Sequence, residues 1–187
     1  MKVFTVPGIN GSGSQHWQTI WELRYGYSRV KQNNWGRPVF ADWKTGLIQT
    51  LNALGEKDRA VFVAHSLGCH LVVKCLPLIK SRVAGILLVA PPDLTSPVFT
   101  IDLTDFAGNH GVLPDVSGYL VYSENDPFAS IAFSEKLSLE LGLHAFNGGR
   151  LGHINADSGH GEWNEGHELL VQFLKSLRVQ TPGEQPA

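Results

Sequence analysis

The 187-residue sequence lacks the features that mark several classes of protein. It has only two cysteines, Cys69 and Cys75, which fall on different faces of one expected helix and cannot easily form a disulfide. We therefore expect reduced cysteines and a cytoplasmic protein. No apolar run reaches the roughly 20 residues that a membrane span needs. Residues 1–11 also lack the apolar region and cleavage site of a signal peptide.

Charge is scarce as well. Charged residues make up 17% of the chain, and the formal net charge is −2. No cluster of lysine and arginine stands out, which argues against a nucleic-acid or anionic-membrane partner. His153, Asp157 and His160 are close in sequence, but no set of residues shows clear metal-ligand spacing. We expect no metal and no cofactor, while a protein partner and the oligomeric state stay open.

What the sequence does contain is an alternation of short apolar runs with amphipathic segments. This pattern predicts an α/β fold, with a doubly wound, mostly parallel sheet covered by helices on both faces. We expect a single domain over residues 1–178 and a flexible polar tail at 179–187. The expected strands are 3–6, 38–40, 60–64, 83–90, 118–125 and 143–147, and the expected helices are 16–25, 43–54, 66–76, 130–141 and 162–177.

Residues 91–117 do not fit this alternation. A structureless loop of this length is uncommon in a compact domain, so we interpret it as a functional flap with at most a short helical turn. It is rich in apolar residues: Val98, Phe99, Phe106, Val112 and Leu113. These residues either form an apolar wall of an open pocket, suited to small acyl groups, or simply pack the loop onto the core.

The segment Ala64-His65-Ser66-Leu67-Gly68 lies between an apolar strand and a helix. It matches the small-x-Ser-x-Gly elbow of hydrolases, in which a strained strand-to-helix turn projects the serine hydroxyl above the sheet. The backbone N–H of Leu67 would then stabilise negative charge on a reacting oxygen, as one donor of an oxyanion hole. The alternative is that Ser66 merely caps the helix, which serine does often.

A nucleophilic serine needs a base and an orienting acid, which follow it in the order acid, then histidine, in doubly wound hydrolases. Asp126 comes just after a predicted strand and is the first choice for the acid, with Asp93 second. His153 lies in a glycine-rich loop after the last strand and is the first choice for the base. His160 is its competitor.

The other acidic residues and histidines are not expected to take part in catalysis. We expect solvated loop carboxylates at Asp102, Asp105 and Asp115, a strand position for His144 and a surface position for His167.

Further site residues are expected in the glycine-rich loop at 6–14. Its glycines allow a close approach of the backbone to substrate, and Ile9 N–H is the preferred second oxyanion donor, with Asn10 next. A plain flexible turn is the alternative. His65 and His70 flank the serine, and each is either a packing or a pocket residue. The residues expected to contact substrate are Asn10, His65, Phe99 and Phe128.

Four blocks in order carry a family resemblance: "PGINGSGSQHWQ", "VAHSLGC", "SENDPF" and "GHINADSGHGEWNEG". The sequence resembles the small serine hydrolases typified by retinoblastoma-binding protein 9 and the bacterial YdeN-like proteins. The resemblance implies a minimal α/β-hydrolase without a large cap and a triad of Ser66, Asp126 and His153. It also implies packing beneath the site for His16 and Trp17. Asn164 stands where relatives often carry proline.

These observations predict a serine hydrolase that cleaves a small or short-chain carboxylic ester through an acyl-enzyme. A thioesterase or an amide or aminoacyl hydrolase would use the same residues. A non-catalytic protein-interaction module is the remaining alternative, since the five tryptophans could anchor an interface.

Overall fold

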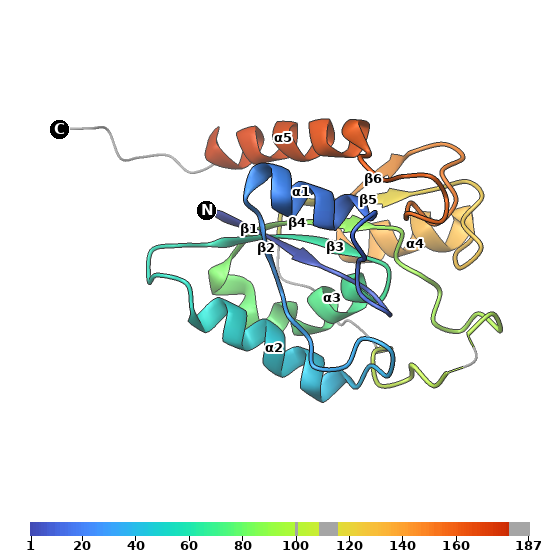
Figure 1. Cartoon of the computed structure of the whole chain (residues 1–187), viewed down its shortest axis with the longest axis horizontal. Helices are drawn as coiled ribbons and strands as arrows, with labels where there is room; N and C mark the ends of the chain where they lie inside the picture. Colours follow the sequence, from blue (N-terminus) through green and yellow to red (C-terminus); the bar gives the residue numbers. More distant parts are fainter. Residues whose placement is uncertain (100, 109–115, 180–187) are drawn as a thin grey trace.

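The computed structural model describes residues 1–99, 101–108 and 116–179, and a six-stranded sheet forms its centre (Figure 1). The strand order is β2-β1-β3-β4-β5-β6, and every adjacent pair is parallel. His110, Val112, Leu113 and Asp115 lie outside the described residues, as does the expected tail except for Val179. The strands are β1 (Lys2–Val6), β2 (Ser28–Arg29), β3 (Ala60–His65), β4 (Val83–Val89), β5 (Gly118–Tyr122) and β6 (His144–Asn147).

Helices cover both faces of this sheet, which confirms the predicted doubly wound α/β fold (Figure 1). One face packs against α1 (Trp17–Tyr25) and α5 (Asn164–Val179). The other packs against α2 (Phe40–Asn52), α3 (Leu67–Ile79) and α4 (Ile131–Leu141). The described residues form no separate cap domain, and none of their helices is long and apolar enough to cross a bilayer.

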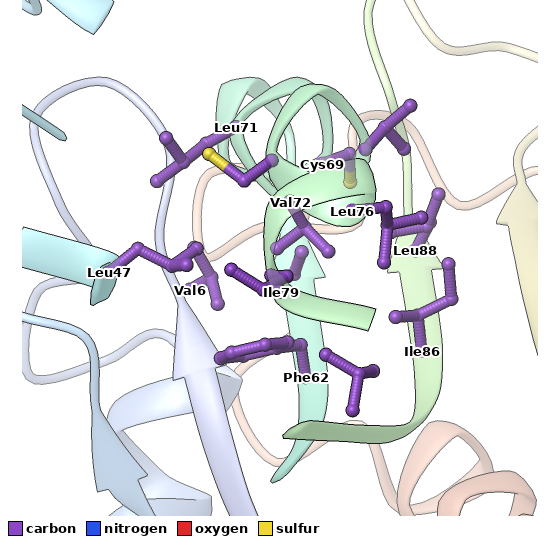
Figure 2. Packing of buried hydrophobic residues seen from close by; sticks show 14 of the residues in the cluster. Val6, Leu47, Phe62, Cys69, Leu71, Val72, Leu76, Ile79, Ile86 and Leu88 are labelled. Atoms are coloured by element: carbon purple, nitrogen blue, oxygen red, sulfur yellow. The ribbon is translucent and has the colours of Figure 1, made fainter. Parts of the chain in front are cut away.

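The central strand β3 is buried over its whole length, which explains its unbroken apolar sequence. Phe62 points into the larger core cluster, where it meets side chains of α3 and β4 (Figure 2). Val61 and Val63 point to the opposite face and join the α1–α5 cluster. This two-sided burial fixes the end of β3, and with it the position of the serine that follows.

The expected strand at 38–40 is wrong. Phe40 instead begins α2, and its backbone N–H donates to the carboxylate of Asp105 at 2.7 Å, so Asp105 caps a helix rather than lying free in solvent. The edge strand beside β1 is instead β2 (Ser28–Arg29), which pairs with β1 alone. Ser28 and Arg29 are too few and too polar to show the alternating hydrophobic pattern of a strand. The short apolar run at 38–40, in contrast, has the composition of a strand but precedes and begins α2.

Helix boundaries follow the sequence more closely. Gly26 and Gly142 end α1 and α4 in the left-handed conformation, as their positions predict. However, α3 continues through Pro77 to Ile79 rather than ending at the proline. Proline removes one backbone donor, but the burial of Leu76 and Ile79 holds the helix against the sheet. Cys69 and Cys75 are both buried and unbridged, as expected.

The described part of segment 91–117 is a series of turns that is fastened to the core. His70 donates through Nε2 to the carbonyl of Pro92 at 2.7 Å. Phe106 is fully buried against Phe40 and Trp43, and Lys74 donates to two carbonyls of the segment. Phe106 therefore packs the loop onto the core, as one of the two predictions had it, while Val98 and Phe99 line a pocket.

An aromatic cluster joins α1 to α5. Trp17 and Trp21 contact Trp163, and the ring of His167 stacks on Tyr25 with 3.7 Å between centroids. His167 lies at the surface, as predicted, but its side chain is only partly exposed, and Nε2 lies 3.0 Å from the hydroxyl of Tyr27. Burial, and to a lesser extent the charge of Arg24, lower the pKa of His167.

Acid should destabilise the protein partly through His167. Its pKa is lowered from 6.5 in the folded state, so the unfolded chain binds a proton that the folded chain resists. This contribution to stability is present above pH 6.5 and is lost as the pH falls below it. We expect urea unfolding between about pH 5 and 8 to show a smaller loss of stability in His167→Gln than in wild type. His144→Gln, on the exposed edge strand, is the control, and equal slopes in all three proteins would contradict the assignment.

Candidate active site

The site lies where the sheet reverses its strand order. From β1 the chain moves outward to the edge strand β2 and then returns to β3 on the other side of β1. Loops at the carboxyl ends of β1 and β3 therefore diverge and leave a crevice, which is the usual place for ligands in open α/β sheets. A pocket of about 730 Å³ occupies this position, and residues that follow each of the six strands line it.

Ser66 occupies the corner between β3 and α3 in a strained conformation, with φ 54° and ψ −129°. Its side chain makes no capping hydrogen bond to the helix, so the structure does not support the simple helix-cap alternative. A Cβ atom at Gly68 would overlap the carbonyl oxygen of Val6. The small residue two positions after the serine is therefore required by the crossing of α3 over the end of β1.

Three predicted side chains meet at this corner. Ser66 Oγ lies 2.9 Å from His153 Nε2, and His153 Nδ1 lies 3.0 Å from both carboxylate oxygens of Asp126. An ionised carboxylate only accepts hydrogen bonds, so Nδ1 carries the proton and Nε2 is free to accept from the serine. The Asp126 side chain is 2% exposed and also accepts from the backbone N–H of Phe128.

Two side chains that the sequence did not single out tie the aspartate loop to the histidine loop. Ser123 Oγ accepts from the backbone N–H of Leu151 at 2.9 Å, and Asn125 Oδ1 accepts from that of Gly152 at 2.8 Å. Ser123 also donates to Asn125. Both residues belong to the "SENDPF" block. Their position just before Asp126 was the only indication in the sequence that they help to hold the site.

Two ring N–H groups donate hydrogen bonds to the backbone at His153 and Ile154. His65 Nε2 donates to the carbonyl of His153 at 2.9 Å, and Trp17 Nε1 donates to that of Ile154 at 2.8 Å. Burial, followed by the neighbouring His153 and His16, lowers the pKa of His65 well below 6.5. His65 thus stays neutral and supports the histidine loop, in addition to lining the pocket.

His16 lies beside this support, as the resemblance implied. Its Nδ1 accepts from the backbone N–H of Gln18 and so caps α1. Burial is the main cause that lowers its pKa to about 4, so the ring is neutral near pH 7. Among the described residues, no group of three histidine, cysteine or acidic side chains is arranged to hold a metal ion.

The expected oxyanion donors lie beside the serine. Leu67 is the first residue of α3, where a helix leaves its backbone N–H groups without internal partners. The β1 loop runs close to this corner, because a Cβ atom at Gly8 would lie 2.8 Å from Ser66 Cβ and 3.1 Å from Leu67 N. Ile9 follows Gly8 and lines the pocket.

The remaining expected contact residues, Asn10, Phe99 and Phe128, also line the pocket. The Phe128 ring meets the His153 ring edge-on, with 4.6 Å between centroids, and stacks with Phe99. Asn10 has φ 63° and donates through its backbone to the carbonyl of Trp35. The pocket therefore has an aromatic side next to the histidine.

The competing candidates have other partners. The carboxylate of Asp93, the second choice for the acid, accepts from the backbone and hydroxyl of Thr95. His160 donates its backbone N–H to the carbonyl of Asn155 and does not line the pocket.

Comparison with known proteins gives a family and a fold. No curated protein sequence matches this chain significantly. A YdeN-like hydrolase from Pectobacterium atrosepticum is 27% identical, with a TM-score of 0.83 over 94% of this chain and 91% of that one. The ydeN gene product of B. subtilis is 20% identical, with a TM-score of 0.73 over 93% and 98%. A Bacillus cereus carboxylesterase is 17% identical, with a TM-score of 0.53 over 81% and 80%, which shows the fold alone.

The profile of the serine hydrolase family matches residues 3–172, a range that includes every residue of the site described above. This match and the similarity to YdeN-like hydrolases agree with the resemblance that the four sequence blocks predicted. The chain belongs to the serine hydrolase family.

Proposed function

We propose that this protein hydrolyses small or short-chain carboxylic esters through an acyl-enzyme on Ser66. The observation that carries the proposal is the continuous hydrogen-bonded series from Ser66 through His153 to Asp126 at the edge of the pocket. A hydroxyl, an imidazole and a carboxylate in this order form the arrangement that activates serine in acyl transfer.

In the first half-reaction, His153 Nε2 accepts the Ser66 proton while Oγ attacks the ester carbonyl carbon. Asp126 keeps the proton of His153 on Nδ1 and favours the imidazolium that forms. The tetrahedral intermediate then collapses, and the imidazolium gives its proton to the departing alkoxide. The products of this half-reaction are an alcohol and an acyl-Ser66 ester.

The negative oxygen of the tetrahedral intermediate would be held by the backbone N–H groups of Leu67 and Ile9. The N-terminal end of α3 adds a partial positive charge at this point. Removal of one such donor in another serine hydrolase cost about 3–4 kcal/mol of barrier height. Water then attacks the acyl-enzyme with His153 again as the base, which releases the acid and restores Ser66.

The lining of the pocket supports a small acyl group. Val98, Phe99, Ile101 and Phe128 supply an apolar surface, while the described flap residues leave the pocket open to solvent. A thioester or an amide would use the same nucleophile and oxyanion donors. A panel of short and long esters, thioesters and aminoacyl amides, run on wild type and Ser66→Ala, ranks these bonds, and we expect short esters to be preferred over long-chain ones.

Ser66→Ala should abolish turnover without unfolding the protein. Loss of the nucleophile in another triad lowers kcat by a factor on the order of 10⁶. A fluorophosphonate probe should label wild type and not the variant, with both proteins giving the same far-ultraviolet circular dichroism. Full esterase activity in Ser66→Ala would refute the proposal, and a folded wild type that neither hydrolyses the panel nor takes the label would favour a binding module.

The strain at Ser66 gives a stability prediction. Ser66 and an alanine in its place must both adopt φ 54°, whereas glycine reaches this region freely. We expect Ser66→Gly to have a free energy of unfolding about 1 kcal/mol higher than Ser66→Ala. Chemical denaturation of the two inactive variants measures the difference. An alanine variant as stable as the glycine variant would show that the corner is unstrained.

Gly8→Ala should impair catalysis selectively. The added Cβ would press on Ser66 Cβ and Leu67 N, which displaces the proposed oxyanion site. We expect kcat to fall by roughly 10²–10³ with KM little changed. Gly13→Ala is the matched control, since an added Cβ there meets no atom within 4 Å. Equal kcat values in the two variants would place the oxyanion site elsewhere.

A further inference from the structure

Negative side chains outnumber positive ones among the described residues that line the pocket. No lysine or arginine of the described chain lines it, whereas Asp157 does. A second carboxylate, Asp126, lies directly behind His153 and is almost fully buried. One acidic group is therefore exposed in the lining of the pocket, and a second lies behind the His153 ring.

The histidines of the pocket do not balance these carboxylates. His16 and His65 are held neutral near pH 7 by their burial. Their hydrogen bonds agree with this state, because His16 Nδ1 accepts from a backbone N–H and His65 Nε2 meets a backbone carbonyl. The opposing positive contributions come from Arg29, which acts on His16 and is ion-paired with Glu22, and from the N-terminal end of α3, equivalent to about half a charge at Ser66.

Asp157 is free to meet a ligand. Its side chain is exposed at the pocket and makes no hydrogen bond or ion pair with another described residue. It follows the turn of residues 153–156, which is held by hydrogen bonds from His65 and Trp17 and by the bond that Asn155 N–H donates to Ser158 Oγ. A concave site of one charge sign concentrates ligands of the opposite sign.

We propose that the pocket prefers substrates that carry a positive charge, and that Asp157 is the residue that selects them. The substrate class is then a small ester, thioester or amide with an ammonium group in its acyl or leaving portion. The apolar side formed by Phe99 and Phe128 takes the uncharged portion. The expected preference in rate rests on the proposed hydrolase function. The preference in binding can be measured without any turnover.

The catalytic test compares esters that differ only in charge. In the first pair, the hydrolysis of acetylcholine is compared with that of its uncharged isostere, in which a tert-butyl group replaces the trimethylammonium group. A second pair carries the same replacement in the acyl chain of a nitrophenyl ester. At low salt we expect kcat/KM of wild type to be higher, by up to about fivefold, for the cationic member of at least one pair, because fivefold is the upper end of the range for an exposed ion pair.

Variants assign this preference to Asp157. In Asp157→Asn the ratio should fall by at least half, and about 0.5 M salt should have the same effect on wild type. Glu56→Gln removes an exposed carboxylate that does not line the pocket and should keep the wild-type ratio. A wild-type ratio of one or less in both pairs, or an unchanged ratio in Asp157→Asn, overturns the inference.

A binding measurement separates this inference from the hydrolase proposal. Choline and its tert-butyl isostere are titrated by NMR into Ser66→Ala, with and without Asp157→Asn. Tighter binding of choline that depends on Asp157 supports the inference even if no ester is cleaved. Equal binding of the two alcohols, or no binding of choline, overturns it even if wild type proves to be an esterase.

Discussion

The geometry of the candidate site depends on one hydrogen bond, between Ser66 Oγ and His153 Nε2. Its two residues are 87 positions apart in the sequence, and 2.9 Å separates the bonding atoms. This bond forms only if the end of β3 and the loop after β6 reach the same edge of the sheet. Parallel pairing of every strand from β1 to β6 meets that condition, because all carboxyl ends then lie together.

The rest of the site keeps the two groups in register. Ser66, Ala90 and Ile154 are non-glycine residues with positive φ, and all three lie at this edge of the sheet. Such conformations cost of order 1–3 kcal/mol each and persist only where surrounding contacts enforce them. The buried strand β3 holds Ser66 in this conformation. The ring N–H groups of His65 and Trp17 hold the backbone around Ile154.

The sequence predicted the parts of this arrangement that have a strong local pattern. The apolar strand before Ser66 and the small residues around it identify the elbow, and chain order identifies Asp126 and His153. Other parts depend on contacts between distant segments. The capping of α2 by Asp105 joins residues 65 positions apart, and His167 is half-buried only because α1 packs beside α5. A two-residue edge strand such as Ser28–Arg29 has no period to detect.

Whether Ser66 and His153 act as one unit is measured most directly by a double-mutant cycle on kcat with Ser66→Ala, His153→Ala and the combined variant. Residues of one catalytic unit are strongly non-additive, because loss of either removes the whole activation. If the two side chains act as one unit, the combined variant is no slower than Ser66→Ala alone. Rate losses that multiply in the combined variant would show that the two side chains contribute independently, and would contradict the proposal that His153 activates Ser66.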